Sequence, residues 1–156
     1  MCRFNIFALI FVTLLSEEIF AKKWVVDTTG KEGDSLQYYI NIAHDSAVAF
    51  GRIDTVFVKN GTYSVFINDT VGLIMKDSIC LVSENGAEYC TLAALSDSAK
   101  DTAWHVIYIE NIGKDTNLAM IRGFTIKNGY AKSNKPHNRG AGIYLSLIHI
   151  SEPTRL

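Results

Sequence analysis

The first hydrophobic pattern in the chain has the period of a helix. Within the stretch GKEGDSLQYYINIAHDSAVAF, apolar residues recur at the three- and four-residue intervals of one helical face. Asp34 is placed to cap the first turn, and Gln37, three residues later, would complete a capping box. The pattern therefore predicts one amphipathic helix at about residues 34–49. Its apolar stripe consists of Leu36, Tyr39, Ile40, Ala43 and Ala47.

After this helix the pattern changes to short runs rich in Val, Ile, Thr, Phe and Tyr, which are typical of β-strands. Four runs end in Asn-Gly or a near variant, in the phrases VFVKNGTY, LVSENGAEY, YIENIG and FTIKNGY. Asn-Gly favours a sharp turn because both residues tolerate a positive φ. The asparagines at positions 60, 85, 111 and 128 are 25, 26 and 17 residues apart, which indicates a repeat architecture. Hairpins are the alternative, and KNGTYSVFI fits a hairpin better than KNGYAKSNKPHNRG does.

These phrases resemble right-handed parallel β-helix proteins of the pectin-lyase type. SLQYYINIAHDSAVAFGRIDTVFVKNGTY is similar to their opening helix and first strand, and GLIMKDSICLVSENGAEYCTL is similar to the coil that follows. MIRGFTIKNGYA and GAGIYL are similar to phrases of later coils. The resemblance covers nearly all of Trp24–Leu145 and implies an all-β fold, a right-handed parallel β-helix (solenoid) with an N-terminal amphipathic capping helix, truncated at its C-terminus. The side chains expected to point inward are Val56, Val58, Ile79, Leu81, Phe124 and Ile126.

Residues 1–21 have the layout of a secretory signal peptide. A basic residue, Arg3, precedes an apolar run that is too short to span a bilayer, and a polar stretch ending in Ala21 follows. Cleavage after Ala21 would leave Lys22 as the mature start. An uncleaved anchor is the competing interpretation. The layout predicts a secreted or cell-surface protein without a membrane span after cleavage.

Residues 145–156, LSLIHISEPTRL, match the translation of a transposase sequencing adapter. Eleven consecutive residues agree with one reading frame of that adapter, so we expect this segment not to be native and exclude it from fold reasoning. The domain expected from the sequence is therefore residues 22–144, the N-terminal part of a parallel β-helix domain.

Composition excludes one class of partner. The net charge of -1 lacks the basic excess that a nucleic-acid-binding surface needs. Of the three cysteines, Cys2 leaves with the predicted signal peptide. Cys80 and Cys90 would enter an oxidising compartment, where a disulfide between them is one alternative. The favoured alternative is that both are small buried hydrophobic residues. The chain has no Cys/His pattern with the spacing of a zinc site.

Charged residues that flank the expected strands are the first place to look for chemistry. Asp54, Lys59, Arg122 and Lys127 do so, but such residues usually solvate the outer face, and no catalytic residue is assigned. The loop YAKSNKPHNRGAG is more informative because a basic loop could hold an acidic sugar. A solvated insertion between coils is the alternative. The candidate ligand-contact residues of this loop are Lys132, Lys135, His137 and Arg139.

Two functions stay open at this point. The first is a glycan-binding or structural, adhesive scaffold outside the cell, with a polysaccharide or cell-surface glycan as its partner. The second, which the resemblance implies, is a polysaccharide lyase or glycoside hydrolase whose active face lies in coils beyond this sequence. No cofactor is evident, and Ca²⁺ would be expected only for a lyase. Whether the protein is an enzyme is left undecided by these residues.

Overall fold

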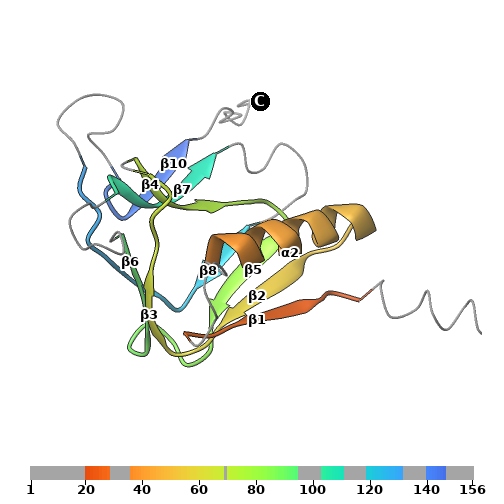
Figure 1. Cartoon of the computed structure of the whole chain (residues 1–156). Helices are drawn as coiled ribbons and strands as arrows, with labels where there is room; N and C mark the ends of the chain where they lie inside the picture. The colour runs from red at the N-terminus through yellow and green to blue at the C-terminus, as the bar shows by residue number, and fades with distance from the viewer. Residues whose placement is uncertain are drawn as a thin grey trace, which may run out of the picture.

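The computed structural model describes residues 20–28, 36–68, 70–94, 103–110, 119–131 and 140–146. Within these ranges the chain forms one α-helix and ten β-strands (Figure 1). The predicted signal peptide lies outside the described residues up to residue 19, as does the predicted adapter segment from residue 147 onward. The last strand crosses the expected boundary at residue 144, since it runs to Ser146.

The strands form three small sheets, and every strand pairing is parallel. The four-stranded sheet contains, in spatial order, β1 (Lys23–Val26), β2 (Asp54–Val58), β5 (Ile79–Ser83) and β8 (Met120–Arg122). A three-stranded sheet contains β3 (Gly61–Ser64), β6 (Cys90–Ala93) and β9 (Thr125–Lys127). The other three-stranded sheet contains β4 (Val71–Met75), β7 (His105–Glu110) and β10 (Ile143–Ser146).

Successive strands belong to different sheets. The chain passes from β2 to β3 to β4 through all three sheets, and it repeats this order from β5 to β7 and from β8 to β10. Parallel neighbours need a long connection, and here the strands of the other two sheets supply it. The register keeps apolar residues aligned, since Val56 pairs with Trp24 on one side and with Leu81 on the other.

The expected fold class, an all-β single parallel β-helix, is wrong. The strands are divided among three sheets of three or four strands, and a 15-residue helix shares their hydrophobic core, so the chain is neither a single solenoid nor clearly all-β. The physical reason is that the repeated Asn-Gly phrase predicts only where the chain turns. It does not determine how many strands share a sheet or what the helix packs against.

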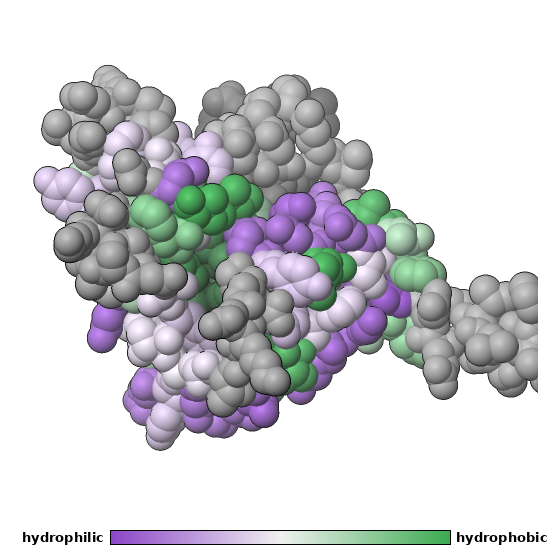
Figure 2. All heavy atoms as spheres, viewed as in Figure 1, coloured by the Kyte–Doolittle hydropathy of each residue, from purple (hydrophilic) through white to green (hydrophobic). Residues whose placement is uncertain are grey.

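The helix α2 (Leu36–Phe50) packs against β1, β2, β4 and β5. Its buried residues belong to the predicted stripe, and they are Leu36, Ile40, Ala43 and Ala47. Tyr39, the remaining member, is partly buried against the same core. The solvent side of α2 is mainly hydrophilic, and a hydrophobic area lies next to it (Figure 2).

Gln37 has a different role from the predicted capping box. Its Oε1 accepts a hydrogen bond from Ile74 N at 2.7 Å, and its Nε2 donates to Ile74 O at 3.1 Å. Nε2 also lies 3.0 Å from Oδ1 of Asn41. The side-chain amide therefore occupies both backbone groups of Ile74 on β4, an edge strand of its sheet. Edge strands invite pairing with other chains, and this contact covers part of that edge. Asp34, the predicted cap residue, lies outside the described residues.

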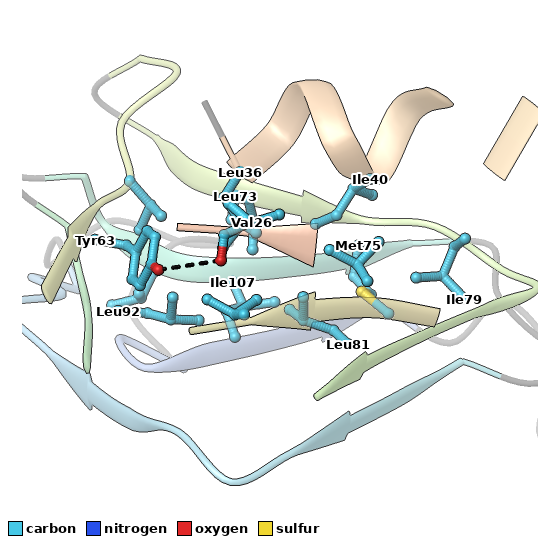
Figure 3. Packing of buried hydrophobic residues seen from close by; sticks show 14 of the residues in the cluster. Val26, Leu36, Ile40, Tyr63, Leu73, Met75, Ile79, Leu81, Leu92 and Ile107 are labelled. Atoms are coloured by element: carbon cyan, nitrogen blue, oxygen red, sulfur yellow. Dashed lines mark hydrogen bonds between the residues drawn. The ribbon is translucent and has the colours of Figure 1, made fainter. Parts of the chain in front are cut away.

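The core lies where the three sheets and the helix meet. Figure 3 shows side chains from α2 and from all three sheets directed into one cluster. The hydroxyl group of Tyr63 closes one side of this cluster, at 2.9 Å from Lys59 O and 3.4 Å from Val26 O. Of the six side chains predicted to point inward, Val56, Val58, Ile79 and Leu81 are fully buried, whereas Phe124 and Ile126 are partly buried.

Asp54 is a buried charge at the start of β2. The expectation that it solvates the outer face is wrong, because its side chain is fully buried. Oδ1 accepts hydrogen bonds from Arg52 Nε at 2.8 Å and from the backbone N of Lys22 at 2.9 Å. Oδ2 accepts from Trp24 Nε1 at 3.2 Å and lies 3.5 Å from Arg52 Nη2. Arg52 Nη2 also donates to Ser46 Oγ on α2 at 2.9 Å. We call Asp54 with these four partners the Asp54 network.

Burial by itself would raise the pKa of Asp54. The hydrogen bonds from Lys22, Arg52, Trp24 and Ser46 outweigh burial and hold the pKa below its usual value of 3.8. The carboxylate is therefore charged at neutral pH, and it connects β1, β2 and the C-terminal part of α2.

Replacing Ile40 with Asp is expected to lower the free energy of unfolding by several kcal/mol, about the cost of an unpaired charge in a core. Ile40 is fully buried in the contact between α2 and the sheets. Val48→Asp on the same helix is the matched control, because Val48 is 56% exposed. Urea unfolding measures both variants, and equal losses would contradict the packing described for α2.

Replacing Asp54 with Asn is expected to lower the free energy of unfolding at pH 7 by about 3–5 kcal/mol, the cost of breaking a buried ion pair from one side. Because the folded-state pKa lies below 3.8, the contribution of Asp54 is present above that value and is lost as the pH falls through the folded-state pKa. Urea unfolding from pH 7 down to pH 3 measures the difference in the free energy of unfolding between wild type and variant. This difference should be constant at first and become smaller at the acid end. A difference independent of pH would contradict the lowered pKa of Asp54.

Candidate functional site

Three aromatic side chains gather where β7 and β10 lie side by side. Tyr108 on β7 pairs with Tyr144 on β10, and their rings stack with centroids 5.1 Å apart and planes 6° apart. The ring of His105 lies 4.7 Å from that of Tyr144 and is tilted by 41°. We call His105, Tyr108 and Tyr144 the aromatic cluster.

The parallel register explains why the tyrosines meet. Side chains at paired positions of neighbouring strands point to the same side of a sheet, so Ile74, Tyr108 and Tyr144 form one row across β4, β7 and β10. His105 is fully buried, whereas both tyrosines are half-buried. The cluster is therefore buried at His105 and partly exposed at the two phenol groups.

His105 also holds the chain at Gly140. Its Nδ1 lies 3.0 Å from the carbonyl oxygen of Gly140. Because a carbonyl oxygen only accepts hydrogen bonds, Nδ1 carries the proton in this contact. Gly140 is the residue at which the described chain resumes after residues 132–139. The end of that segment is thus fixed to the aromatic cluster itself.

The beginning of the same segment is fixed nearby. Tyr130 N donates to Ala103 O at 3.1 Å, two residues before His105. A Cβ atom added at Gly129 would overlap the carbonyl oxygen of Ala141, so only glycine allows the two chain ends to approach this closely. The residues on both sides of the segment 131–139 therefore lie beside the aromatic cluster.

The predicted ligand-contact residues Lys132, Lys135, His137 and Arg139 all lie outside the described residues. Their sequence segment has four basic side chains and no acidic residue. We call residues 131–140 the basic segment. What the structure adds is the position of both its ends, next to His105.

The charged residues that flank strands differ in their burial. Lys59, Arg122 and Lys127 are exposed, as expected for residues that solvate the outer face. Asp54 belongs instead to the buried Asp54 network described above. The structure does not bring these four residues to one site, since Asp54 points into the core.

Cys80 and Cys90 are free thiols in the structure, so the disulfide considered from the sequence is not formed. Cys90 is buried, as favoured, and its Sγ lies 3.7 Å from Lys59 O. Cys80 is only partly buried. Burial raises the pKa of Cys80, and it raises the pKa of Cys90 to about 11. Since the thiolate is the nucleophile, neither thiol has the environment of a reactive cysteine.

Sequence reasoning missed the aromatic cluster. It did not align HVIYIE with GIYLS. Both stretches place a tyrosine one residue after an isoleucine, and that alignment is the signal that could have paired Tyr108 with Tyr144.

No group of three or more His, Cys, Asp or Glu residues that could hold a metal ion occurs in the described ranges. The helix of the described chain is not long and apolar enough to cross a membrane. Comparison with protein-family models, with curated proteins and with solved structures found no match.

The thiols give a test of the native packing. In the folded chain of residues 1–156 at pH 8 and without reductant, Cys90 should resist iodoacetamide, because it is buried and burial raises its pKa to about 11. Cys80 should react more slowly than a free cysteine, and both should react fully in urea. Peptide mass mapping assigns each label and separates these two from Cys2. Rapid native labelling of Cys90, or recovery of a Cys80–Cys90 disulfide, would contradict the structure.

Proposed function

We propose that this protein binds an anionic polysaccharide outside the cell, through the aromatic cluster together with the basic segment, whose last residue, Gly140, bonds to His105. It would act as an extracellular glycan-binding scaffold, exported by the predicted signal peptide. The observation that carries the proposal is the anchoring of the basic segment at the cluster through His105 and Gly140.

The tyrosines supply the part of the site that suits a sugar ring. A phenol combines an apolar face with a hydroxyl that can donate or accept a hydrogen bond, and this combination is frequent where a partner is both apolar and polar. Tyr144 lies on β10, an edge strand of its sheet, and it stacks on Tyr108 of the neighbouring strand. The stacked pair restricts both rings, so little side-chain entropy remains to be lost on binding.

The basic segment supplies the charge. Lys132, Lys135 and Arg139 are positive at neutral pH, and no acidic residue between positions 131 and 140 offsets them. The whole chain carries a net charge of -1, so this local excess is not a consequence of overall composition. A local positive field attracts a polyanion, and salt weakens the attraction. Uronic-acid polymers, which combine sugar rings with carboxylates, fit both parts of the site.

Isothermal titration calorimetry of the exported protein with polygalacturonate tests the proposal, with an uncharged galactan as the comparison ligand. Binding should be stronger for polygalacturonate and should weaken as salt rises. Tyr144→Ala should reduce the affinity by about tenfold, the effect of losing about 1.4 kcal/mol of ring contact. Tyr144→Phe keeps the ring and should stay close to wild type.

The charge contribution has its own variants. Lys135→Gln combined with Arg139→Gln should weaken binding and make it less sensitive to salt. Lys127→Gln is the matched control, since Lys127 is an exposed lysine outside the basic segment. Equal affinity for the charged and the uncharged polymer, or the same loss in the control, would contradict the proposal.

A further inference from the structure

The backbone of Lys22 is the point at which the N-terminal chain joins the fold. Its carbonyl oxygen accepts a hydrogen bond from Thr55 N at 2.8 Å, which begins the pairing of β1 with β2. Its backbone N donates to Oδ1 of Asp54 at 2.9 Å. Phe20 and Ala21, the two described residues before it, are exposed, Phe20 to 74%.

The charge of the Lys22 backbone nitrogen, which donates to Asp54, depends on whether the signal peptide has been removed. In the uncut chain this nitrogen belongs to the Ala21–Lys22 amide and is neutral. The sequence predicts a signal-peptidase site at this bond, with Ala21 immediately before it and Ile19 two positions further back. Hydrolysis adds one water across the bond, leaving a carboxylate on Ala21 and an α-ammonium group on Lys22.

We propose that Asp54 is a receptor for the mature N-terminus, so that removal of the signal peptide after Ala21 creates a partly buried ion pair between the α-ammonium group of Lys22 and the Asp54 carboxylate. The uncut chain already makes the hydrogen bond, but with a neutral donor. A charged donor at the same distance makes a stronger bond to a carboxylate.

The surroundings of Asp54 can accommodate this second cation. Asp54 is fully buried, and among the described residues the side-chain cation that bonds to it is Arg52, through Nε at 2.8 Å. The side chains of Trp24 and Ser46, which also contribute hydrogen bonds to this carboxylate, are neutral. The Nζ of Lys22 lies 3.8 Å from the centroid of the Trp24 ring and is thus directed to the indole. The contact of the Lys22 backbone N with Asp54 is only partly buried, which leaves room for solvent beside this nitrogen.

Processing therefore changes stability as well as length. The precursor can fold with the neutral contact, and the exported chain gains a charge-assisted bond that fixes the first residue of the β1–β2 pairing. The position of the cut matters, because a chain that begins one residue earlier presents Asp54 with an amide again.

Secretion of the chain from residue 1, with its predicted signal peptide, gives the first test. N-terminal sequencing and intact-mass measurement of the exported protein should find Lys22 as the first residue. A mature start at any other residue would overturn the proposal, because the nitrogen at Asp54 would then be an amide or would be missing.

Acetylation of the exported protein gives the second test. An acetylating reagent at pH 6.5 modifies the α-amine in preference to lysine side chains. The modification restores an uncharged amide at the backbone nitrogen of Lys22. Acetylation should lower Tm by about 3 °C or more, the size expected when a charge-assisted contact is lost in a domain of this length. In Asp54→Asn the same modification should change Tm by less than a third as much. Equal shifts in both proteins, or no shift in wild type, would overturn the proposal.

A rate measurement keeps the proposal testable if Asp54→Asn does not fold. The α-amine held by Asp54 should acetylate at least fivefold more slowly in the native protein than in the same protein in urea. An equal rate in both states would show that the terminus is free, which contradicts an ion pair with Asp54.

Discussion

The buried carboxylate of Asp54 is the interaction on which the N-terminal half of this structure depends. It receives donors from β1, from the residues before β2 and, through Arg52 and Ser46, from the end of α2. Burying a single carboxylate is costly unless its oxygens are fully hydrogen-bonded, and here both oxygens have partners. The cost of burial therefore favours one arrangement, because moving any of the three elements would remove some of the donors to this charge.

The helix α2 makes polar contacts with both the four-stranded sheet and the β4–β7–β10 sheet. Its buried stripe packs on the core, while Gln37 holds the edge strand β4 and His44 Nδ1 lies 3.1 Å from the carbonyl oxygen of Asp77. At its other end, Ser46 connects with the Asp54 network. Three polar contacts along one helix thus connect the four-stranded sheet with the β4–β7–β10 sheet. The aromatic cluster lies on the second of these sheets, so the proposed glycan site rests on a framework that the helix helps to fix.

The sequence predicted local structure better than it predicted how the elements combine. Helical periodicity is a local property, so the stripe from Leu36 to Ala47 could be recognised from the chain alone, and so could the inward positions Val56 and Leu81. The fold class was wrong because the spacing of Asn-Gly turns does not specify how strands divide among sheets. Asp54 was assigned to the surface because its burial depends on Lys22 and Trp24, about 30 residues away. The pairing of Tyr108 with Tyr144 likewise requires the register of β7 with β10.

The candidate site shows the same limit. The basic segment could be recognised from its composition, because four basic side chains within eight residues are visible in the sequence. The aromatic cluster, by contrast, depends on contacts between residues that are 35 or more positions apart, such as His105 with Gly140. Composition can identify a charged segment, but only the fold shows that Gly140, at the end of this segment, bonds to His105.

Native-state hydrogen exchange tests the central claim most directly, namely that the Asp54 network unites β1, β2 and α2. The relevant amides are those of Thr55 and Lys59, which bond to Lys22 O and Val26 O across the β1–β2 pair, and those of Ala43 and Ala47 inside the helix. If the network unites these elements, all four amides should exchange through one opening reaction with the same free energy. Helix amides that exchange through a separate opening of much lower free energy, while Thr55 and Lys59 stay protected, would contradict this account.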